Sequence, residues 1–314
     1  MSAHPQDRPT PSERKPVTLP RLAEMKFGAE PIVMVTAYDH PSAQVVEAAG
    51  VDIVLVGDSA AMTVLGYDST VPVGMDEMLM LASAVRRGLR TPFLVGDMPF
   101  GSYEQSNEQA VANAQRFVKE AGCEAVKLEG GGSSVERARA IIRAGIPVMG
   151  HVGLTPQTAT ALGGYKAQGK TAGRAAQIAE EALALQAVGC FAIVFEAIPA
   201  EVTAALMPRM DQTVVIGIGA GVDTDGQVLV FHDLLGIFGG HAAKFVKRFA
   251  DVREEMVRGV SGYADEVRRR AFPTREHTYA IEAAELEAFR RYLDHESLAG
   301  TDPTFGGDWA ATEI

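Results

Sequence analysis

The feature that most constrains the fold of this chain is a repeated alternation of short apolar segments with amphipathic ones, which begins at Pro31. Seven apolar segments are expected to form strands: 32–36, 51–56, 92–95, 125–128, 147–149, 192–195 and 214–218. They are almost continuously apolar, as is typical of strands buried on both faces of a parallel sheet. An eighth strand is expected near 228–231 or near 234–238.

The amphipathic segments between these strands predict helices, of which the clearest are 107–121, 134–144 and 174–188. Several helices are expected to end at a glycine just before the next strand: Gly50, Gly122, Gly145 and Gly189. Eight β/α units over roughly 230 residues predict an α/β protein with the fold of a (β/α)8 TIM barrel. No GxGxxG motif follows the first strand, which argues against a doubly wound dinucleotide-binding sheet.

The two ends of the chain differ from the barrel region. Residues 1–17 are polar and proline-rich without the apolar core of a secretory signal, and we expect a disordered tail there. The catalytic barrel is expected to span 18–262 and a C-terminal extension 263–314. Helices are predicted at 251–272, before Pro273, and at 280–293, with a loose segment from Asp294 onward.

Charge and cysteine content exclude some classes of function. With 29 Lys and Arg against 40 Asp and Glu, the net charge is −11, which argues against unspecific binding to nucleic acid or to an anionic membrane. No apolar segment approaches the ~20 residues needed to span a bilayer. Cys123 and Cys190 stand in apolar surroundings without metal-ligand spacing, which predicts two buried, reduced thiols in a cytoplasmic protein.

Polar residues cluster where the expected strands end. In a β/α barrel the C-terminal ends of the strands meet at one mouth, where active sites form. The residues at these ends are Tyr38, Asp39, Asp58, Ser59, Asp97, Lys127, Glu129, His151, Glu196 and the glycine-rich turn 217–221. Each alone has a structural explanation, because aspartates after strands are common helix caps and a Lys beside a Glu forms ion pairs.

The combination of these residues points to a metal. Five carboxylates at one mouth repel one another unless a positive charge lies among them, and a hard divalent cation with oxygen ligands supplies that charge. Because the mouth offers no cysteine and one histidine, Mg²⁺ is favoured over Zn²⁺.

At these residues the chain resembles the ketopantoate hydroxymethyltransferase family. The matching stretches are MVTAYD (34–39), LVGDS (55–59), DMPF (97–100), VKLEGG (126–131), GHVGLTPQ (150–157), GGYKAQG (163–169) and GIGAG (217–221). Residues 225–227 and 232–233 continue the match, which covers about 17–249. The proline-rich start and the stretch after about residue 260 are longer than the family pattern.

The resemblance implies a (β/α)8 barrel of the phosphoenolpyruvate/pyruvate-type superfamily, dependence on Mg²⁺ and assembly into a homodecamer. It implies transfer of the one-carbon unit of 5,10-methylenetetrahydrofolate to 3-methyl-2-oxobutanoate through a Mg-stabilised enolate, which gives 2-dehydropantoate for pantothenate and coenzyme A synthesis. The expected partners are therefore these small molecules and other copies of the chain, with neither nucleic acid nor membrane involved.

Residue roles follow from the matched positions. Asp58 and Asp97 match the aspartates of the metal site, and Glu129 matches its third acidic residue. Ser59 and Lys127 match contacts to the oxo acid, which the two aspartates share.

Two further matches concern proton transfer. His151 matches a residue near the substrate, and Glu196 matches the proton acceptor. The chemistry agrees with these roles, because a ketone oxygen polarised by Mg²⁺ and a nearby Lys makes the C3 proton acidic enough for a carboxylate to remove.

Two alternatives remain open on the residues. A Mg-dependent lyase or mutase of the same superfamily also stabilises an enolate, although such lyases usually carry a catalytic Cys in a Lys-Cys-Gly-type loop. Cys123 and Cys190 stand in other contexts. A non-catalytic barrel scaffold would predict broken strand-end carboxylates, and all the matched ones are present.

Overall fold

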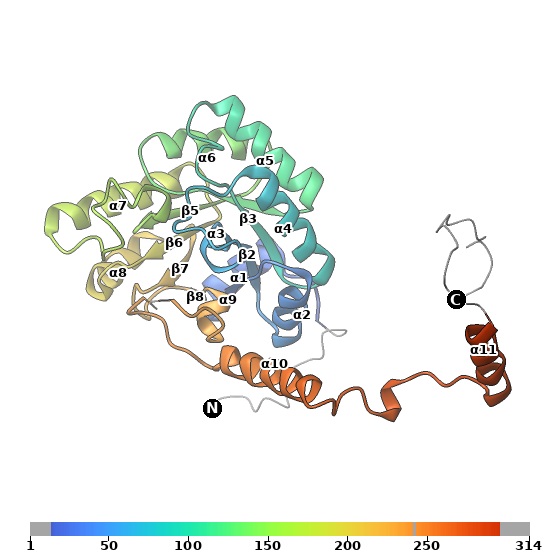
Figure 1. Ribbon diagram of the computed structural model, residues 1–314. Coiled ribbons are helices and arrows are strands. Elements are labelled where there is room, and N and C mark those ends of the chain that lie inside the picture. The colour runs from blue at the N-terminus through green and yellow to red at the C-terminus, as the bar shows by residue number, and fades with distance from the viewer. Residues whose placement is uncertain (1–13, 241–242, 296–314) are drawn as a thin grey trace. The chain divides into compact units, whose positions relative to one another are not determined.

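Eight parallel strands close into a barrel in chain order, each paired with its sequence neighbours and β1 with β8 (Figure 1). The structure is a computed structural model that describes residues 14–240 and 243–295. The strands are β1 (Ile32–Thr36), β2 (Ile53–Val56), β3 (Phe93–Asp97), β4 (Ala125–Lys127), β5 (Val148–Gly153), β6 (Ala192–Glu196), β7 (Val214–Ile218) and β8 (Gly226–Leu229). This confirms the predicted (β/α)8 barrel.

The strands depart from expectation at two places. β5 runs on to Gly153, so His151 lies inside a strand rather than after one. The eighth strand is the first of the two expected candidates but begins at Gly226, and residues 234–238 form no strand. Gly226 packs directly against the carbonyl group of Ile32 on β1, where a side chain would not fit. The strand therefore requires glycine at this position, and a pattern of apolar residues does not reveal a strand that begins with glycine.

Helices cover the outside of the barrel (Figure 1). They are α2 (His40–Ala49), α4 (Met75–Gly88), α5 (Asn107–Ala121), α6 (Ser133–Arg143), α7 (Ala172–Ala187) and α8 (Ala200–Leu206). The four-residue helices α3 (Ala60–Thr63) and α9 (Phe231–Leu234) follow β2 and β8 at the C-terminal end of the barrel. α5 shows how the local sequence sets both ends of a helix. The Ser106 hydroxyl accepts a hydrogen bond from the Gln109 amide at 3.1 Å, and Gly122 ends the helix with a φ of 68°, which only glycine adopts readily.

The interior of the barrel is filled by side chains and closed at its N-terminal end. Alternate residues of the strands point inward and pack in apolar layers, among them Ile32, Ile53 and Phe93, the first residues of their strands. α1 (Leu19–Phe27) precedes β1, and its Leu22 and Met25 are buried in the same apolar cluster. This helix therefore covers the N-terminal end of the barrel, and the opposite end remains for a site.

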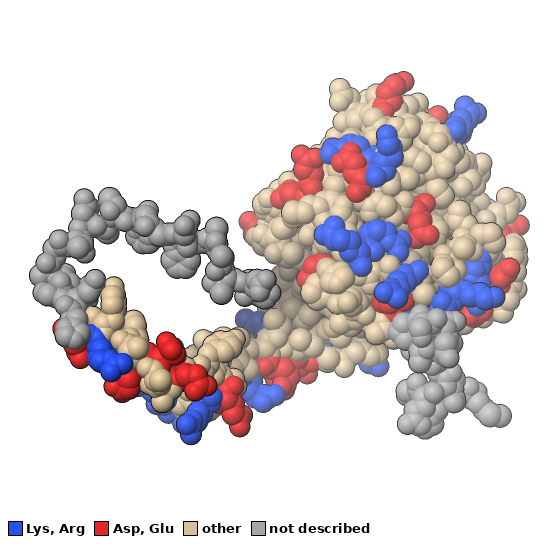
Figure 2. Space-filling model, turned by 90° about the vertical axis from the view of Figure 1, so that its right-hand side faces the viewer, with Lys and Arg blue, Asp and Glu red and all other residues tan. Residues whose placement is uncertain are grey.

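The described residues divide into two compact units between Glu254 and Glu255, and the expected division at 262/263 stays a prediction. On the visible face of the first unit, basic and acidic side chains are interspersed (Figure 2). α10 (Val252–Arg268) and α11 (Ala283–His295) confirm both expected C-terminal helices, with α10 ending four residues early and α11 starting three residues late. The expected disordered start and loose end lie mostly outside the described residues.

None of the helices in the described ranges combines the length and the apolar character that crossing a membrane requires. This finding agrees with the absence of a long apolar segment from the sequence.

The covering helix generates a test of the fold. We expect Leu22→Ala to lower the free energy of unfolding by about 2–5 kcal/mol, because Leu22 is fully buried and its loss leaves a cavity. Urea and thermal unfolding measure the change. Glu24→Ala on the exposed face of α1 is the matched control and should change stability by less than about 0.5 kcal/mol. Equal stability of the two variants would show that α1 does not close the barrel.

Candidate active site

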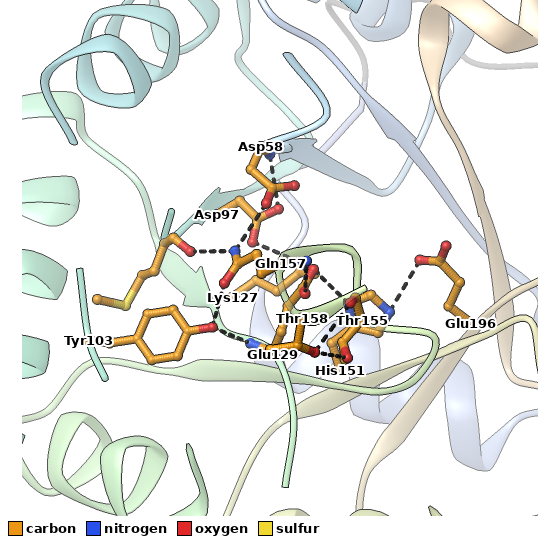
Figure 3. A network of polar contacts seen from close by, with 11 residues as sticks. Asp58, Asp97, Tyr103, Lys127, Glu129, His151, Thr155, Gln157, Thr158 and Glu196 are labelled. Carbon is orange, nitrogen blue, oxygen red and sulfur yellow. Dashed lines mark hydrogen bonds and ion pairs between the residues drawn. The ribbon is translucent and has the colours of Figure 1, made fainter. Parts of the chain in front are cut away.

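The charged residues of the barrel mouth come from the same strand faces as its apolar core. Side chains two residues apart on a strand point to the same side, so the residue that follows an inward apolar residue by two also points inward. These pairs are Val95 and Asp97 on β3, Ala125 and Lys127 on β4, Met149 and His151 on β5, and Val194 and Glu196 on β6. A charged layer therefore follows the apolar layers toward the C-terminal ends of the strands, and Figure 3 shows its polar side chains.

Asp58 and Ser59 extend this layer from the end of β2. The backbone amide of Asp58 donates a hydrogen bond to Asp97 Oδ2 at 3.0 Å, which brings the two aspartates together. The hydroxyl groups of Ser59 and Tyr38 lie 2.8 Å apart. Asp39, which follows Tyr38, is instead the cap of α2 and accepts from the Ser42 amide at 2.7 Å. Of the two residues after β1, only Tyr38 therefore touches the site.

Lys127 is the positive centre of the cluster. Its Nζ lies 2.7 Å from Asp97 Oδ1 and 3.5 Å from Glu129 Oε1, and all three side chains are almost fully buried. Burial alone would lower the pKa of Lys127, but the carboxylates of Asp97 and Glu129 outweigh burial and raise it. Burial likewise would raise the pKa of Glu129, but Lys127, the His151 ring and the backbone amide of Gln157 together outweigh burial and lower that pKa. The lysine is therefore charged.

His151 joins Glu129 to Glu196. Its Nδ1 lies 3.3 Å from Glu129 Oε1 and its Nε2 lies 3.2 Å from Glu196 Oε2. Neither ring nitrogen has a partner in hydrogen-bond geometry, so these contacts are close ion pairs rather than aligned hydrogen bonds. Burial lowers the pKa of His151, but the two glutamates outweigh it and raise the pKa to about 9. At neutral pH the ring is thus protonated and cannot accept a further proton.

Asp58 is the least compensated charge. Burial raises its pKa well above the ordinary range, and the nearby carboxylates of Asp97 and Glu129 raise it further. The pKa of Asp97 is also raised, by burial, although Lys127 opposes the shift. A divalent cation beside Asp58 and Asp97 would remove this repulsion.

The donor set fits Mg²⁺ in a restricted sense. Mg²⁺ is commonly held by one or two carboxylates, with water and substrate oxygens completing its ligands. Among the residues that the structure describes, no three His, Cys, Asp or Glu side chains converge as ready metal ligands. Both oxygens of Glu129 face donors of the chain: Lys127 and His151 at Oε1, and the Gln157 amide at Oε2, 3.0 Å away. Both oxygens of Asp97 also face donors, Lys127 at Oδ1 and the Asp58 backbone amide at Oδ2, so among these carboxylate oxygens Asp58 Oδ1 alone accepts from no described donor. Asp58 together with the adjoining Asp97 could hold the ion, and the expected share of Glu129 in the metal site stays a prediction.

One cavity of about 910 Å³ connects these groups. All seven residues that the sequence predicts for the site line it: Asp58, Ser59, Asp97, Lys127, Glu129, His151 and Glu196. Its outer part is lined by Tyr165, Lys166 and Lys170 from the β5–α7 connection, and by Lys244 and Phe245 after β8. Part of the predicted glycine turn lines it as well, and the ring of Phe245 packs on Gly219, where a side chain would collide with it.

Two residues of the network carry no role in the sequence analysis. Gln157 lies in the short helix η2 (Pro156–Thr158) within a matched stretch, and Tyr103 lies in the loop after β3 outside every matched stretch. Gln157 Nε2 donates to Asp58 Oδ2 at 3.0 Å, and the Tyr103 hydroxyl donates to Gln157 Oε1 at 2.6 Å (Figure 3). The presence of Gln157 in a matched stretch was the one sequence signal available.

The two cysteines lie away from this chemistry. Cys123 and Cys190 are 3% and 2% exposed, and neither is among the residues that line the cavity. Burial raises the pKa of each thiol to about 12. A thiolate nucleophile is therefore not available from either residue at neutral pH.

Comparison with known proteins agrees with this geometry. The model of the ketopantoate hydroxymethyltransferase family matches residues 16–275. The 3-methyl-2-oxobutanoate hydroxymethyltransferase of Moorella thermoacetica is 51% identical over 268 residues, which cover 85% of this chain and 99% of the relative. The mitochondrial 3-methyl-2-oxobutanoate hydroxymethyltransferase 1 of Oryza sativa subsp. japonica is 50% identical over 289 residues, covering 90% of this chain and 79% of the relative.

Solved structures at low identity share the barrel. Phosphonopyruvate hydrolase, crystallised with oxalate and Mg²⁺, aligns with a TM-score of 0.55 at 11% identity over 88% of this chain and 97% of its own. The 2,3-dimethylmalate lyase of the PEP mutase/isocitrate lyase superfamily aligns with a TM-score of 0.53 at 14% identity, over 93% and 100%. These structures show the fold, whereas the family model and the relatives at about 50% identity decide the family. The chain belongs to the ketopantoate hydroxymethyltransferase family.

Proposed function

We propose that this chain transfers the one-carbon unit of 5,10-methylenetetrahydrofolate to C3 of 3-methyl-2-oxobutanoate, with consumption of water, to give 2-dehydropantoate. Family membership supports the reaction. The observation that carries it is one chain of contacts along a single cavity, from Asp97 through Lys127, Glu129 and His151 to Glu196. It places a charged lysine at one end and a carboxylate base at the other, as removal of a proton beside a ketone requires.

Asp58 and Asp97 are the residues that would hold Mg²⁺. When bound, this ion supplies Lewis-acid polarisation of the ketone oxygen. Glu129 completes the acidic set, and its contacts keep Lys127 and His151 in place. Lys127 contributes a fixed positive charge where negative charge develops on the oxo acid, and Ser59 contributes a hydroxyl group beside it.

Glu196 is proposed as the base that removes the C3 proton. Its side chain is 14% exposed, faces the cavity and contacts the protonated ring of His151. His151 therefore acts as a charged partner that orients Glu196, not as the base itself, because its raised pKa of about 9 keeps it protonated near pH 7. Water is consumed in releasing the one-carbon unit from the folate at the oxidation level of formaldehyde, with tetrahydrofolate as the leaving group. The resulting carbanion equivalent forms a bond to this carbon, whose oxygen takes up a proton and becomes the hydroxyl group of the product.

The two alternative functions lose support. A lyase that depends on a cysteine finds no reactive thiol at the cavity, since both thiols are buried and have raised pKa values of about 12. A scaffold without catalysis gives no reason to bury Asp58 beside Asp97 and Glu129 at a cost in stability. If the protein does not exchange the C3 proton of the oxo acid, the alternative of a non-catalytic scaffold regains support.

Three further expectations from the resemblance remain proposals. They are assembly into a homodecamer, a cytoplasmic location and the use of a folate co-substrate. The mass of the particle in solution, measured by light scattering, tests the first of them.

The metal assignment generates the first prediction of function. We expect Asp58→Asn and Asp97→Asn each to weaken Mg²⁺ binding strongly, because a charged oxygen ligand is lost. Calorimetric titration with Mg²⁺ in the presence of the oxo acid measures this. Metal-free Asp58→Asn should melt no lower than the wild type, because a neutral amide replaces a carboxyl group whose charged form is disfavoured by burial and by Asp97 and Glu129. Unchanged Mg²⁺ affinity in both variants contradicts the assignment.

Lys127 generates a second prediction. Lys127→Met should lower stability by about 3–5 kcal/mol, since it leaves buried carboxylates unpaired, and should also raise KM for the oxo acid and lower kcat. Lys26→Met is the matched control, because Lys26 pairs with Asp225 at 2.7 Å and neither residue lines the cavity. It should lose stability without any kinetic change. If Lys127→Met behaves like this control, Lys127 does not contact the substrate.

The base generates a third prediction. We expect Glu196→Gln to bind Mg²⁺ and oxo acid but to exchange the C3 proton at least about 100-fold more slowly, the usual span for a positioned base. NMR detection of deuterium entry into 3-methyl-2-oxobutanoate measures the rate without folate. Glu24→Gln, on the surface of α1, is the control. Wild-type exchange in Glu196→Gln together with none in His151→Gln would assign the base to His151 instead.

A further inference from the structure

Tyr103 and Gln157 contact the acidic residues Asp58 and Glu129 from the side that faces away from the cavity. They are 2% and 4% exposed, and neither is among the described residues that line the cavity. Their polar atoms nevertheless make three hydrogen bonds to Asp58 and Glu129 and one to each other. The Gln157 side chain donates from Nε2 to Asp58 Oδ2 at 3.0 Å, and the Gln157 backbone amide donates to Glu129 Oε2 at 3.0 Å. The Glu129 backbone amide donates to the Tyr103 hydroxyl at 3.2 Å, and that hydroxyl donates to Gln157 Oε1 at 2.6 Å.

The two terminal groups of this network, one that can only donate and one that can only accept, fix the direction of every hydrogen bond between them. The backbone amide of Glu129 can only donate, so the Tyr103 hydroxyl accepts from it and gives its own proton to Gln157 Oε1. The carbonyl oxygen of Met98 can only accept, and it lies 2.9 Å from Gln157 Nε2. The amide group of Gln157 is therefore held in one orientation, with its donor side toward Asp58.

The fixed orientation of the Gln157 side-chain amide makes the two carboxylate oxygens of Asp58 unequal. Oδ2 accepts from Gln157 (Figure 3), whereas no donor among the described residues is within hydrogen-bond distance of Oδ1. A hydrogen bond from a fixed amide favours the ionised carboxylate and selects which of its oxygens stays free. Turned by 180°, the same amide would present its oxygen to Asp58 and repel it.

We propose that Tyr103 and Gln157 form a positioning relay, in which Tyr103 orients the Gln157 amide and Gln157 holds Asp58 so that Oδ1 is presented to the divalent cation. This inference rests on the proposed metal site at Asp58 and Asp97. Both residues act through Asp58 and touch neither the cation nor the substrate, so they are positioning residues.

The test measures metal binding rather than activity. Mn²⁺ prefers the same oxygen ligands as Mg²⁺, and its electron paramagnetic resonance signal reports the free ion during a titration of the full-length protein. We expect Tyr103→Phe and Gln157→Met each to raise the Kd for Mn²⁺ by about 10–100-fold, the usual range for residues that orient a metal ligand. If the bound ion holds the oxo acid, KM for that substrate should rise together with the Kd for Mn²⁺.

A double variant separates a relay from two independent effects. Because Tyr103 is inferred to act only through Gln157, Tyr103→Phe should change the Kd for Mn²⁺ by less than twofold in a Gln157→Met background. A purely structural role would instead lower the melting temperature of metal-free protein and leave the Kd of the folded fraction unchanged.

Gln186→Met is the matched control for the glutamine. The Gln186 amide also bridges two backbone groups, the Arg209 carbonyl at 3.0 Å and the Gln212 amide at 3.2 Å, and it does not line the cavity. It should leave the Kd for Mn²⁺ unchanged. Tyr67→Phe, whose hydroxyl bonds Glu77 on the surface, is the control for the tyrosine.

The outcomes distinguish this inference from the function on which it rests. If the wild type does not bind Mn²⁺, the metal site itself is wrong. If the wild type binds and both folded single variants bind within twofold of it, the relay is overturned while the metal site stands. Additive effects in the double variant also overturn the relay. Should Gln157→Met not fold, Tyr103→Phe alone decides, because it removes one oxygen atom and nothing else.

Discussion

The two-residue period of side chains along the barrel strands is the constraint on which the rest of this structure depends. In a closed barrel every inward position shares one narrow interior, so a strand that fills the core with Val95 or Val194 must aim Asp97 or Glu196 into the same space two residues later. The apolar layers anchor the strands, and their regular spacing carries the charged layer to a fixed height above them. Catalytic geometry here is thus an extension of core packing.

This arrangement has an energetic cost that the cluster only partly offsets. Three buried carboxylates face one lysine and one protonated histidine, and Lys127 is engaged mainly by Asp97. Asp58 is left with raised pKa and a hydrogen bond from Gln157. Buried charges of this kind seldom stabilise a fold. The unfavourable burial of the Asp58 carboxylate is therefore in keeping with the proposed binding of a cation that the chain itself does not supply.

The sequence allowed the barrel and the seven cavity residues to be predicted, because apolar strands and the residues after them are local features. Two kinds of feature escaped it. Gly226 opens β8 without an apolar side chain, since its backbone has to approach Ile32. Tyr103 reaches Glu129 and Gln157 from 26 and 54 positions away along the chain, through loops that no periodic pattern describes. Contacts between loops depend on the finished barrel and could not be inferred from spacing.

Closure of the barrel by α1 has a kinetic meaning. With Leu22 and Met25 packed across the N-terminal end, the described residues leave the cavity open toward the opposite mouth. In the proposed reaction the oxo acid would bind deep in this cavity, beside Lys127, which is 3% exposed. A co-substrate bound nearer the mouth would then cover the oxo acid, and such a complex would form only with the oxo acid bound first. Closure of one end of the barrel would thereby order the binding of two substrates without any moving part.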